Sequence, residues 1–244
     1  MAKMTLDGLT AQLTQAFGDA LTAVVLYGSA ARSERVESRS DHNVLVVVRA
    51  LTPAALRAAA AAASAWGDAG NLPPLVMTEA EWRSSRDVFA MEHADIEARH
   101  QLLWGALPAP AGPVDATHLR HQLEFEALGK LLAFRQGILA CAGDSKRELE
   151  LLTASRSAVL VLLRTLLRVH GEPATDSAEE VVRRAAALAG FDPAPFLDVI
   201  GHARGTTPIA KARADAVLEA YHAGLKRLVA HVDALVHPGR GPMD

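Results

Sequence analysis

The sequence contains few of the residues that mark oxidised, membrane or base-stacking proteins. Its 244 residues include a single cysteine, Cys141, and aromatic residues make up only 5% of the chain. One cysteine excludes an internal disulfide and is typical of a reducing compartment, so we expect a cytoplasmic protein. The tryptophans Trp66, Trp82 and Trp104 are too scattered along the chain to indicate a platform on which nucleic acid bases would stack.

Long apolar runs and a strong net charge are also missing. No apolar run reaches the length that spans a bilayer, and the segment after Met1 to Lys3 is amphipathic rather than a signal peptide, so we expect no membrane partner. A net charge of −3 argues against binding to long nucleic acid. The sequence leaves the oligomeric state open, and a homodimer is one arrangement that it allows.

Half of the residues are hydrophobic, which is enough to form one large or two small domains with real cores. Residues 105 to 114, rich in glycine, proline and alanine, form the clearest linker. We therefore expect one domain over residues 1–108 and a second over 115–238. Caps and apolar periodicity in the second domain predict an α-helical bundle, with helices from about 117 to 141, 145 to 170, 177 to 190, 193 to 203 and 208 to 236.

The first domain combines strand patterns with helix patterns, which predicts an α+β fold. Apolar residues at helical spacing predict a helix from Leu6 to Phe17, and Thr52-Pro53 begins an alanine-rich helix that extends to about Trp66. β-branched and apolar runs predict strands over 23–27, 43–48, 75–78 and 88–96. The expected architecture is a mixed β-sheet flanked by helices, followed by the C-terminal α-helical bundle.

Polar residues follow the first of these strands and precede the second. Gly28-Ser29 ends the strand 23–27 where a helix would begin, and a glycine there lets another group approach the backbone closely. Free N–H groups at such a corner favour an anion such as a phosphate. Asp41 and Asn43 lie at the start of the next strand, and the two-residue period of a strand places both side chains on one face.

This stretch resembles the DNA polymerase β-type nucleotidyltransferase superfamily, whose signature is an apolar strand, Gly-Ser, a loop of about a dozen residues and then Asp-x-Asp or Asp-x-Glu. Here Gly28-Ser29 is followed by residues 30 to 40 and then by Ser40-Asp41-His42-Asn43. Ala30-Ala31-Arg32 also matches the minimal and aminoglycoside nucleotidyltransferases of that superfamily. The departure is Asn43, which stands where the superfamily usually has its second metal-binding carboxylate.

The resemblance implies a site for an NTP, Mg²⁺ and an acceptor hydroxyl. It implies that Gly28 and Ser29 hold the triphosphate, that Arg32 and Lys130 contact phosphate, that Glu126 is the base, and that Asp41, Asn43 and Glu92 bind the metal. Asp95 is the second candidate for the metal-binding role given to Glu92. Mg²⁺ prefers anionic oxygens, so an asparagine at position 43 implies weaker metal binding. The plainer interpretations are that Glu92 faces solvent and that Glu126 and Lys130 form an ordinary surface pair.

The sequence therefore favours an enzyme that transfers a nucleoside monophosphate from NTP–Mg²⁺ to a hydroxyl of a small molecule or protein, with activity weakened by Asn43. One alternative is a catalytically degenerate protein that binds nucleotide and regulates. Another is suggested by Arg164 and His170, whose Arg-x5-His spacing resembles that of the HEPN ribonucleases of toxin–antitoxin type systems. His118 and His121 have the spacing of a metal-binding pair on a helix, but surface histidines are the simpler interpretation.

Overall fold

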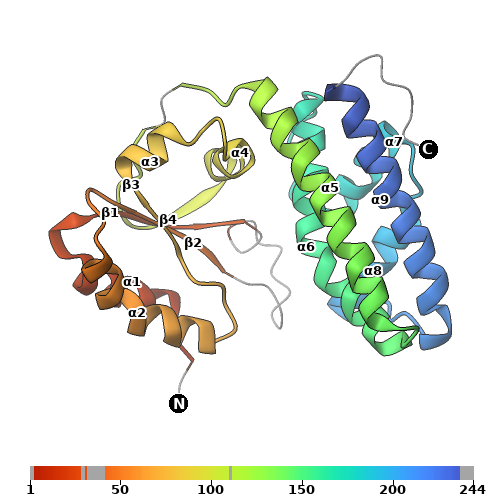
Figure 1. Cartoon of the computed structure of the whole chain (residues 1–244), viewed down its shortest axis with the longest axis horizontal. Coiled ribbons are helices and arrows are strands. Elements are labelled where there is room, and N and C mark those ends of the chain that lie inside the picture. Colours follow the sequence, from red (N-terminus) through yellow and green to blue (C-terminus); the bar gives the residue numbers. More distant parts are fainter. Residues whose placement is uncertain (1–2, 29–30, 32–41, 110–111, 237–244) are drawn as a thin grey trace. The chain divides into compact units, whose positions relative to one another are not determined.

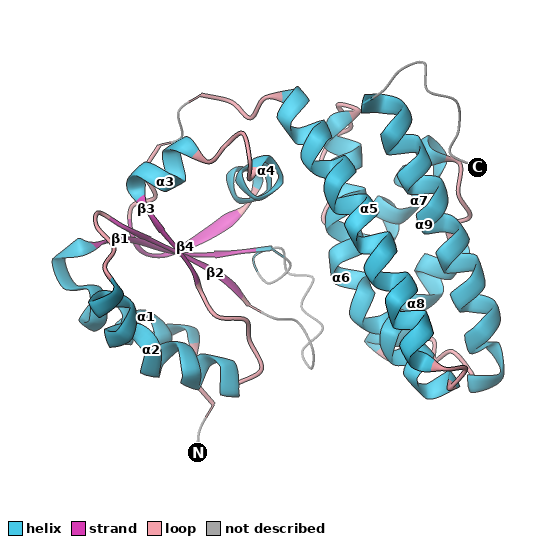
Figure 2. Ribbon diagram, in the orientation of Figure 1, coloured by secondary structure: helices cyan, strands magenta, loops and turns pink. Residues whose placement is uncertain are grey.

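The computed structural model describes residues 3–28, 31, 42–109 and 112–236 (Figure 1). The chain divides into two compact units, Met1–Asp115 and Ala116–Asp244. Each unit has its own secondary structure, and the first contains all of the described strands (Figure 2).

The strands described in the first unit form one mixed sheet. They are β1 (Leu21–Tyr27), β2 (Asn43–Val48), β3 (Leu75–Thr78) and β4 (His100–Gly105), in the order β3-β2-β1-β4. The pair β2–β3 is parallel, and β1 pairs antiparallel with both β2 and β4. The central strands β1 and β2 are buried over most of their length, as their continuous valine and leucine runs predict.

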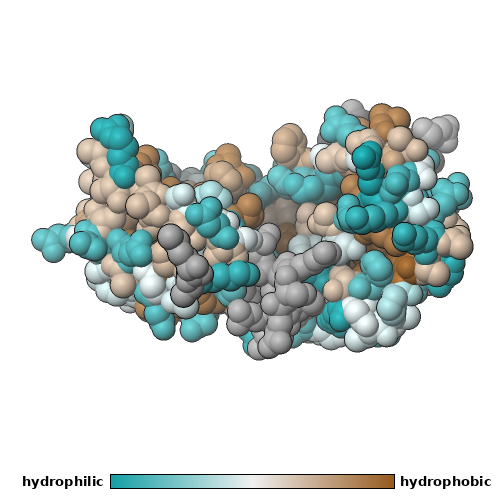
Figure 3. Space-filling view, turned by 90° about the horizontal axis from the view of Figure 1, so that it is seen from below, coloured by the Kyte–Doolittle hydropathy of each residue, from teal (hydrophilic) through white to brown (hydrophobic). Residues whose placement is uncertain are grey.

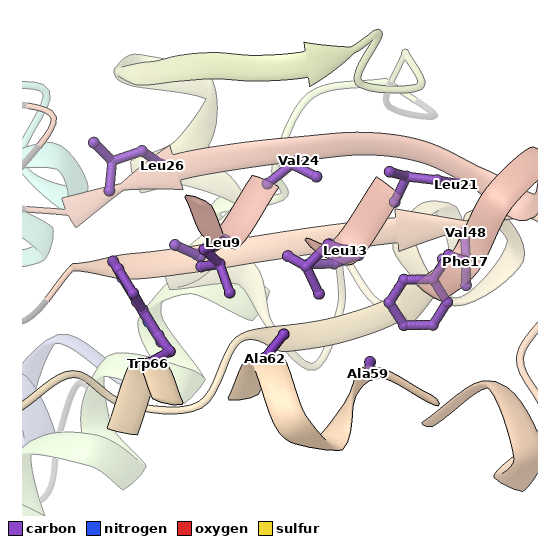
Figure 4. Close-up of a cluster of buried hydrophobic side chains, with 12 residues drawn as sticks. Leu9, Leu13, Phe17, Leu21, Val24, Leu26, Val48, Ala59, Ala62 and Trp66 are labelled. Carbon is purple, nitrogen blue, oxygen red and sulfur yellow. The ribbon is translucent and has the colours of Figure 1, made fainter. Parts of the chain in front are cut away.

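One face of the sheet is covered by α1 (Leu6–Phe17) and α2 (Pro53–Asp68). Thr5 and Thr52 cap these helices, each accepting a hydrogen bond from a main-chain N–H in the first turn. Figure 4 shows the apolar side chains of both helices directed at those of the strands, with Trp66 of α2 at one end of the cluster. The two predicted helices and their apolar faces are confirmed.

The opposite face is covered by α3 (Glu79–Ser84) and α4 (Ala90–Ala98). Thr78 and Glu81 form a reciprocal capping box at the start of α3. Trp82 of α3 and Ile96 of α4 pack on this face, against alternate residues of β1 and β2. Because alternate residues of each central strand lie on opposite faces, the sheet has a hydrophobic core on both sides.

The strand predicted over 88–96 is wrong. Residues 90–98 form α4, whose buried residues include Ala90, Met91 and Ala94, and the remaining strand is β4 at 100–105. Alanine, methionine and glutamate favour helix, and the segment has no β-branched residue between Val88 and Ile96. Val88 is 62% exposed, so the apolar start of the segment does not enter the core.

The second unit is an α-helical bundle, as predicted. It contains α5 (Ala116–Cys141), α6 (Ser145–Val169), α7 (Ala178–Ala189), α8 (Ala194–Arg204) and α9 (Ala214–Val236). Asp144 caps α6 and Ser177 caps α7, and Gly190 ends α7 in the left-handed conformation. The last helix begins at Ala214 rather than near Pro208, and a short 3-10 turn over Lys211–Arg213 precedes it.

Some large apolar side chains stay at the surface, including Phe125 and Leu139 of α5, which are 76% and 80% exposed. Figure 3 shows, on one face of the molecule, hydrophobic side chains scattered among hydrophilic ones. Among the residues that the structure describes, no helix combines the length and the apolar composition needed to cross a membrane.

Candidate functional site

The end of β1 and the start of β2 meet at Gly28 and Asn43. Gly28 has a φ of +77°, and a Cβ atom added to it would lie 2.8 Å from Nδ2 of Asn43. Tyr27, the residue before Gly28, pairs directly with Asn43 across the two strands. Both the positive φ and the close approach require glycine at position 28. The corner predicted from Gly28 is therefore in direct contact with the strand that carries Asn43.

Two carboxylates of α4, Glu92 and Asp95, influence Tyr27, the residue before Gly28. Burial raises the pKa of the Tyr27 hydroxyl, and the negative charges of Glu92 and Asp95 raise it further. A strand would have placed Glu92 and Asp95 on opposite faces, whereas residues three apart on a helix share a face. Correcting the strand to a helix thus brings both carboxylates toward Tyr27, the neighbour of Asn43.

Ser29, Arg32 and Asp41 lie outside the described residues, so their predicted roles stay predictions. Within the part of the chain that the structure describes, no three histidine, cysteine, aspartate or glutamate side chains are grouped closely enough to hold a metal ion. The amide oxygen of Asn43 and the carboxylates of Glu92 and Asp95, whose charges act on Tyr27, are oxygen ligands of the kind that Mg²⁺ prefers. The chemistry of these groups therefore fits Mg²⁺, and Asn43 supplies one negative charge fewer than the second carboxylate of the signature would.

Similarity to known proteins is found in the fold and not in the sequence. No protein-family model matches the sequence, and no curated protein matches it. The crystal structure of spectinomycin adenyltransferase AAD(9) from Enterococcus faecialis, with ATP and spectinomycin, is similar to this chain, with a TM-score of 0.56 and 14% sequence identity. The match covers 90% of this chain and 96% of that chain. The chain has the nucleotidyltransferase fold. The architecture predicted from the Gly-Ser corner and the following strands is thereby confirmed, together with the helical bundle.

The predicted base and its partner lie on the bundle that follows the nucleotidyltransferase sheet. Glu126 and Lys130 are one turn apart on α5, and their Oε2 and Nζ atoms are 3.1 Å apart. Their side chains are 31% and 44% exposed, which is typical of a surface ion pair and worth only about 0.3–0.5 kcal/mol. This geometry is compatible with either role, so catalysis by Glu126 stays a prediction.

His170, which with Arg164 suggested a ribonuclease, contacts another histidine of the bundle. His170 follows α6, and its Nε2 lies 3.1 Å from Nε2 of His231 on α9. Burial and the neighbouring His170 lower the pKa of His231. His170 therefore lies against a second half-buried histidine of the bundle.

The sequence did not single out Tyr27 as a residue of the nucleotidyltransferase corner. Tyr27 continues the apolar run of β1, and its ring packs with the core beneath α3 and α4. The available signal was its position directly before Gly28. A residue there necessarily pairs across to the strand that begins at Asn43.

Proposed function

We propose that the protein transfers a nucleoside monophosphate from an NTP to a hydroxyl group of a small molecule or protein. The observation that carries the proposal is the direct approach of Gly28 to Asn43 at the end of β1, in a chain with the fold of an adenyltransferase. A glycine corner gives a phosphate chain access to the main chain. The neighbouring carboxylates of Glu92 and Asp95 make the same corner favourable for a cation.

In this proposal Gly28 and Ser29 bind the triphosphate, and Arg32 and Lys130 contact its phosphates. Asp41, Asn43 and Glu92 hold Mg²⁺, and the carboxylate of Asp95 adds negative charge nearby. When bound, the metal would neutralise the triphosphate and lower the barrier to attack on it. The amide of Asn43 contributes an oxygen but no charge, so weak metal binding is expected.

Glu126 is proposed as the base that accepts the proton of the acceptor hydroxyl. The hydroxyl oxygen forms a bond to the α-phosphorus, the bond from that phosphorus to the bridging oxygen breaks, and pyrophosphate leaves with the electron pair. The adenyltransferase of similar structure was solved with ATP and spectinomycin. ATP and spectinomycin are therefore the first donor and acceptor to test.

The direct test is transfer of label from an α-labelled NTP, together with calorimetric titration of ATP and GTP with and without Mg²⁺. The proposal expects Mg²⁺-dependent binding, label in the acceptor, and loss of both in Asp41→Ala. Binding without transfer, joined to a gain of transfer in Asn43→Asp, would instead indicate a site that kept the nucleotide and lost catalysis. Absence of both binding and transfer in the wild type would overturn the proposal.

Glu126 can be tested against a matched ion pair of the same bundle. Glu150 of α6 pairs with Lys146 across one turn at 3.9 Å, as Glu126 does with Lys130. Glu126→Gln should lower kcat by about 10²-fold or more, which is the usual contribution of a general base, while Glu150→Gln should leave kcat unchanged. Equal, small effects of the two substitutions would make Glu126 an ordinary surface residue.

A further inference from the structure

His42, the residue between Asp41 and Asn43, faces the opposite side of the sheet from Asn43. Its ring packs against Trp66 of α2 in a T-shaped arrangement, with ring centroids 5.7 Å apart and an interplanar angle of 61°. Trp66 belongs to the core under α1 and α2, whereas Asn43 shares a face with Tyr27. The alternation of a strand therefore already applies at His42, just before β2 begins.

The carboxamide of Asn71 joins His42 to the end of α2. Its Oδ1 accepts a hydrogen bond from the main-chain N–H of His42 at 3.1 Å and lies 3.2 Å from Nδ1 of the same residue. Its Nδ2 donates to the main-chain oxygen of Trp66 at 3.3 Å, and the Asn71 main-chain N–H donates to that oxygen at 3.4 Å. One side chain thus connects the start of β2 to the last turns of α2.

This network fixes the orientation of both side chains. A main-chain N–H can only donate, so the atom of Asn71 that faces it must be the oxygen, and the amide nitrogen must then face the Trp66 carbonyl. Because that oxygen can only accept, Nδ1 of His42 must carry a hydrogen. The ring bond forms with neutral histidine in this tautomer and also with the imidazolium, since both carry a hydrogen on Nδ1.

We propose that Asn71 is a positioning residue of the nucleotidyltransferase site, an inference that rests on the function proposed above. The N–H that it holds belongs to the peptide bond between Asp41 and His42. Fixing this peptide sets the direction in which the chain enters β2, and therefore the face on which Asn43 presents its oxygen to Mg²⁺ and the triphosphate. A small misplacement of such a ligand can lower the rate by orders of magnitude.

The test compares Asn71→Leu, which removes the acceptor oxygen at similar size, with Asn71→Asp, which retains it. Asn71→Leu should raise the Mg²⁺ concentration for half-maximal transfer about tenfold and lower kcat. Asn71→Asp keeps the acceptor but places a carboxylate oxygen against the Trp66 carbonyl, so it should keep the slow exchange of the His42 amide and restore only part of the activity. Asn71→Leu should also speed hydrogen exchange of the His42 amide at least about tenfold, because that N–H loses its partner. Gln15→Leu, which replaces an exposed amide on α1, is the control for the chemical change.

A second variant separates the two bonds to Asn71. His42→Phe keeps the main-chain N–H and an aromatic ring beside Trp66, so it should lose much less activity than Asn71→Leu. The proposal is overturned if an active wild type and Asn71→Leu share one Mg²⁺ dependence and one His42 exchange rate, or if the His42 amide exchanges as fast in Asn71→Asp as in Asn71→Leu. An inert wild type would instead refute the proposed function, and the positioning role would fail with it.

Discussion

Alanine substitution of Gly28 separates the two physical reasons for a glycine at the end of β1. An L-residue at a φ of +77° costs about 1–2 kcal/mol. The new Cβ would also lie 2.8 Å from Nδ2 of Asn43, so the Asn43 side chain must leave its rotamer, which costs about 0.5–1.5 kcal/mol more. Gly28→Ala should therefore lower the free energy of unfolding of the first unit by about 1.5–3.5 kcal/mol.

Two other glycines provide a lower and an upper comparison for the destabilisation expected of Gly28→Ala. Gly190 has a φ of +69° and nothing within 4 Å of an added Cβ, so Gly190→Ala should show the backbone cost alone. Gly105 has a φ of +70°, but its Cβ would lie 2.1 Å from the main-chain oxygen of Thr22, which cannot swing away. Gly105→Ala should therefore be the most destabilising of the three, and Gly190→Ala the least.

Denaturant unfolding measures these differences in each unit. The three tryptophans lie in the first unit and report its unfolding by fluorescence, while far-UV circular dichroism follows the loss of helix in both units. The functional readout is calorimetric binding of NTP–Mg²⁺, which Gly28→Ala should weaken because Asn43 is displaced and which Gly190→Ala should leave unchanged. Equal destabilisation by Gly28→Ala and Gly190→Ala, with unchanged nucleotide binding, would refute the close contact between Gly28 and Asn43.

Three further predictions concern buried positions, one in the first unit and two in the helical bundle. Burial, and secondarily the charge of Arg86, lower the pKa of His93 below 6.5. Its contribution to stability is therefore present above pH 6.5 and is lost as the pH falls below that value. The free energy of unfolding should accordingly rise with pH between about pH 4 and 8, and His93→Gln should reduce that slope. Tyr221 is buried and its hydroxyl lies 3.1 Å from Oγ of Ser155, so Tyr221→Phe should lower the free energy of unfolding by about 1 kcal/mol in denaturant titration. A Cβ at Gly224 would lie 2.4 Å from the ring of Phe196, so Gly224→Ala should cost about 1–3 kcal/mol in the same assay.

The parts of the fold that the sequence predicted are those encoded by local signals. The continuous apolar runs of β1 and β2 have no competing helical pattern, and the caps at Thr52, Asp144 and Ser177 begin helices at the expected positions. These features depend on neighbours along the chain, so an isolated sequence contains them. The helical bundle was predictable for the same reason.

The error at 88–96 had a different origin. A nine-residue segment containing apolar and charged residues has no clear period, so helix and strand could not be separated there. The strand that completes the sheet, β4, is exposed over its first three residues and depends on the free edge of β1 for its hydrogen bonds. Its formation is a long-range property that the local pattern at 100–105 does not encode.

In the candidate site, too, the local features were predictable from the sequence and the long-range contacts were not. The sequence predicted that Gly28 would let another group approach the main chain closely, and in the structure that group is Asn43 of the same motif. The approach of Glu92 and Asp95 to Tyr27, and the bond from Asn71 to His42, join residues that are far apart in sequence. No spacing rule predicts which amide of the chain will hold a given peptide bond, so only the folded structure indicates Asn71.

Asn43→Asp distinguishes a weakened metal site from a corner that never binds metal. Glu92 and Asp95 already act on Tyr27 beside Asn43, so another carboxylate there adds repulsion and should destabilise the metal-free protein by about 1 kcal/mol. If the corner is a Mg²⁺ site, the same carboxylate tightens metal binding, and Mg²⁺ at 100 times its Kd would stabilise the variant by about 2.7 kcal/mol. Thermal unfolding with and without Mg²⁺ should therefore show a lower Tm than wild type in chelator and a larger rise on adding the metal. A variant that is destabilised in chelator and gains no more from Mg²⁺ than the wild type would mean that these carboxylates do not share a cation with residue 43.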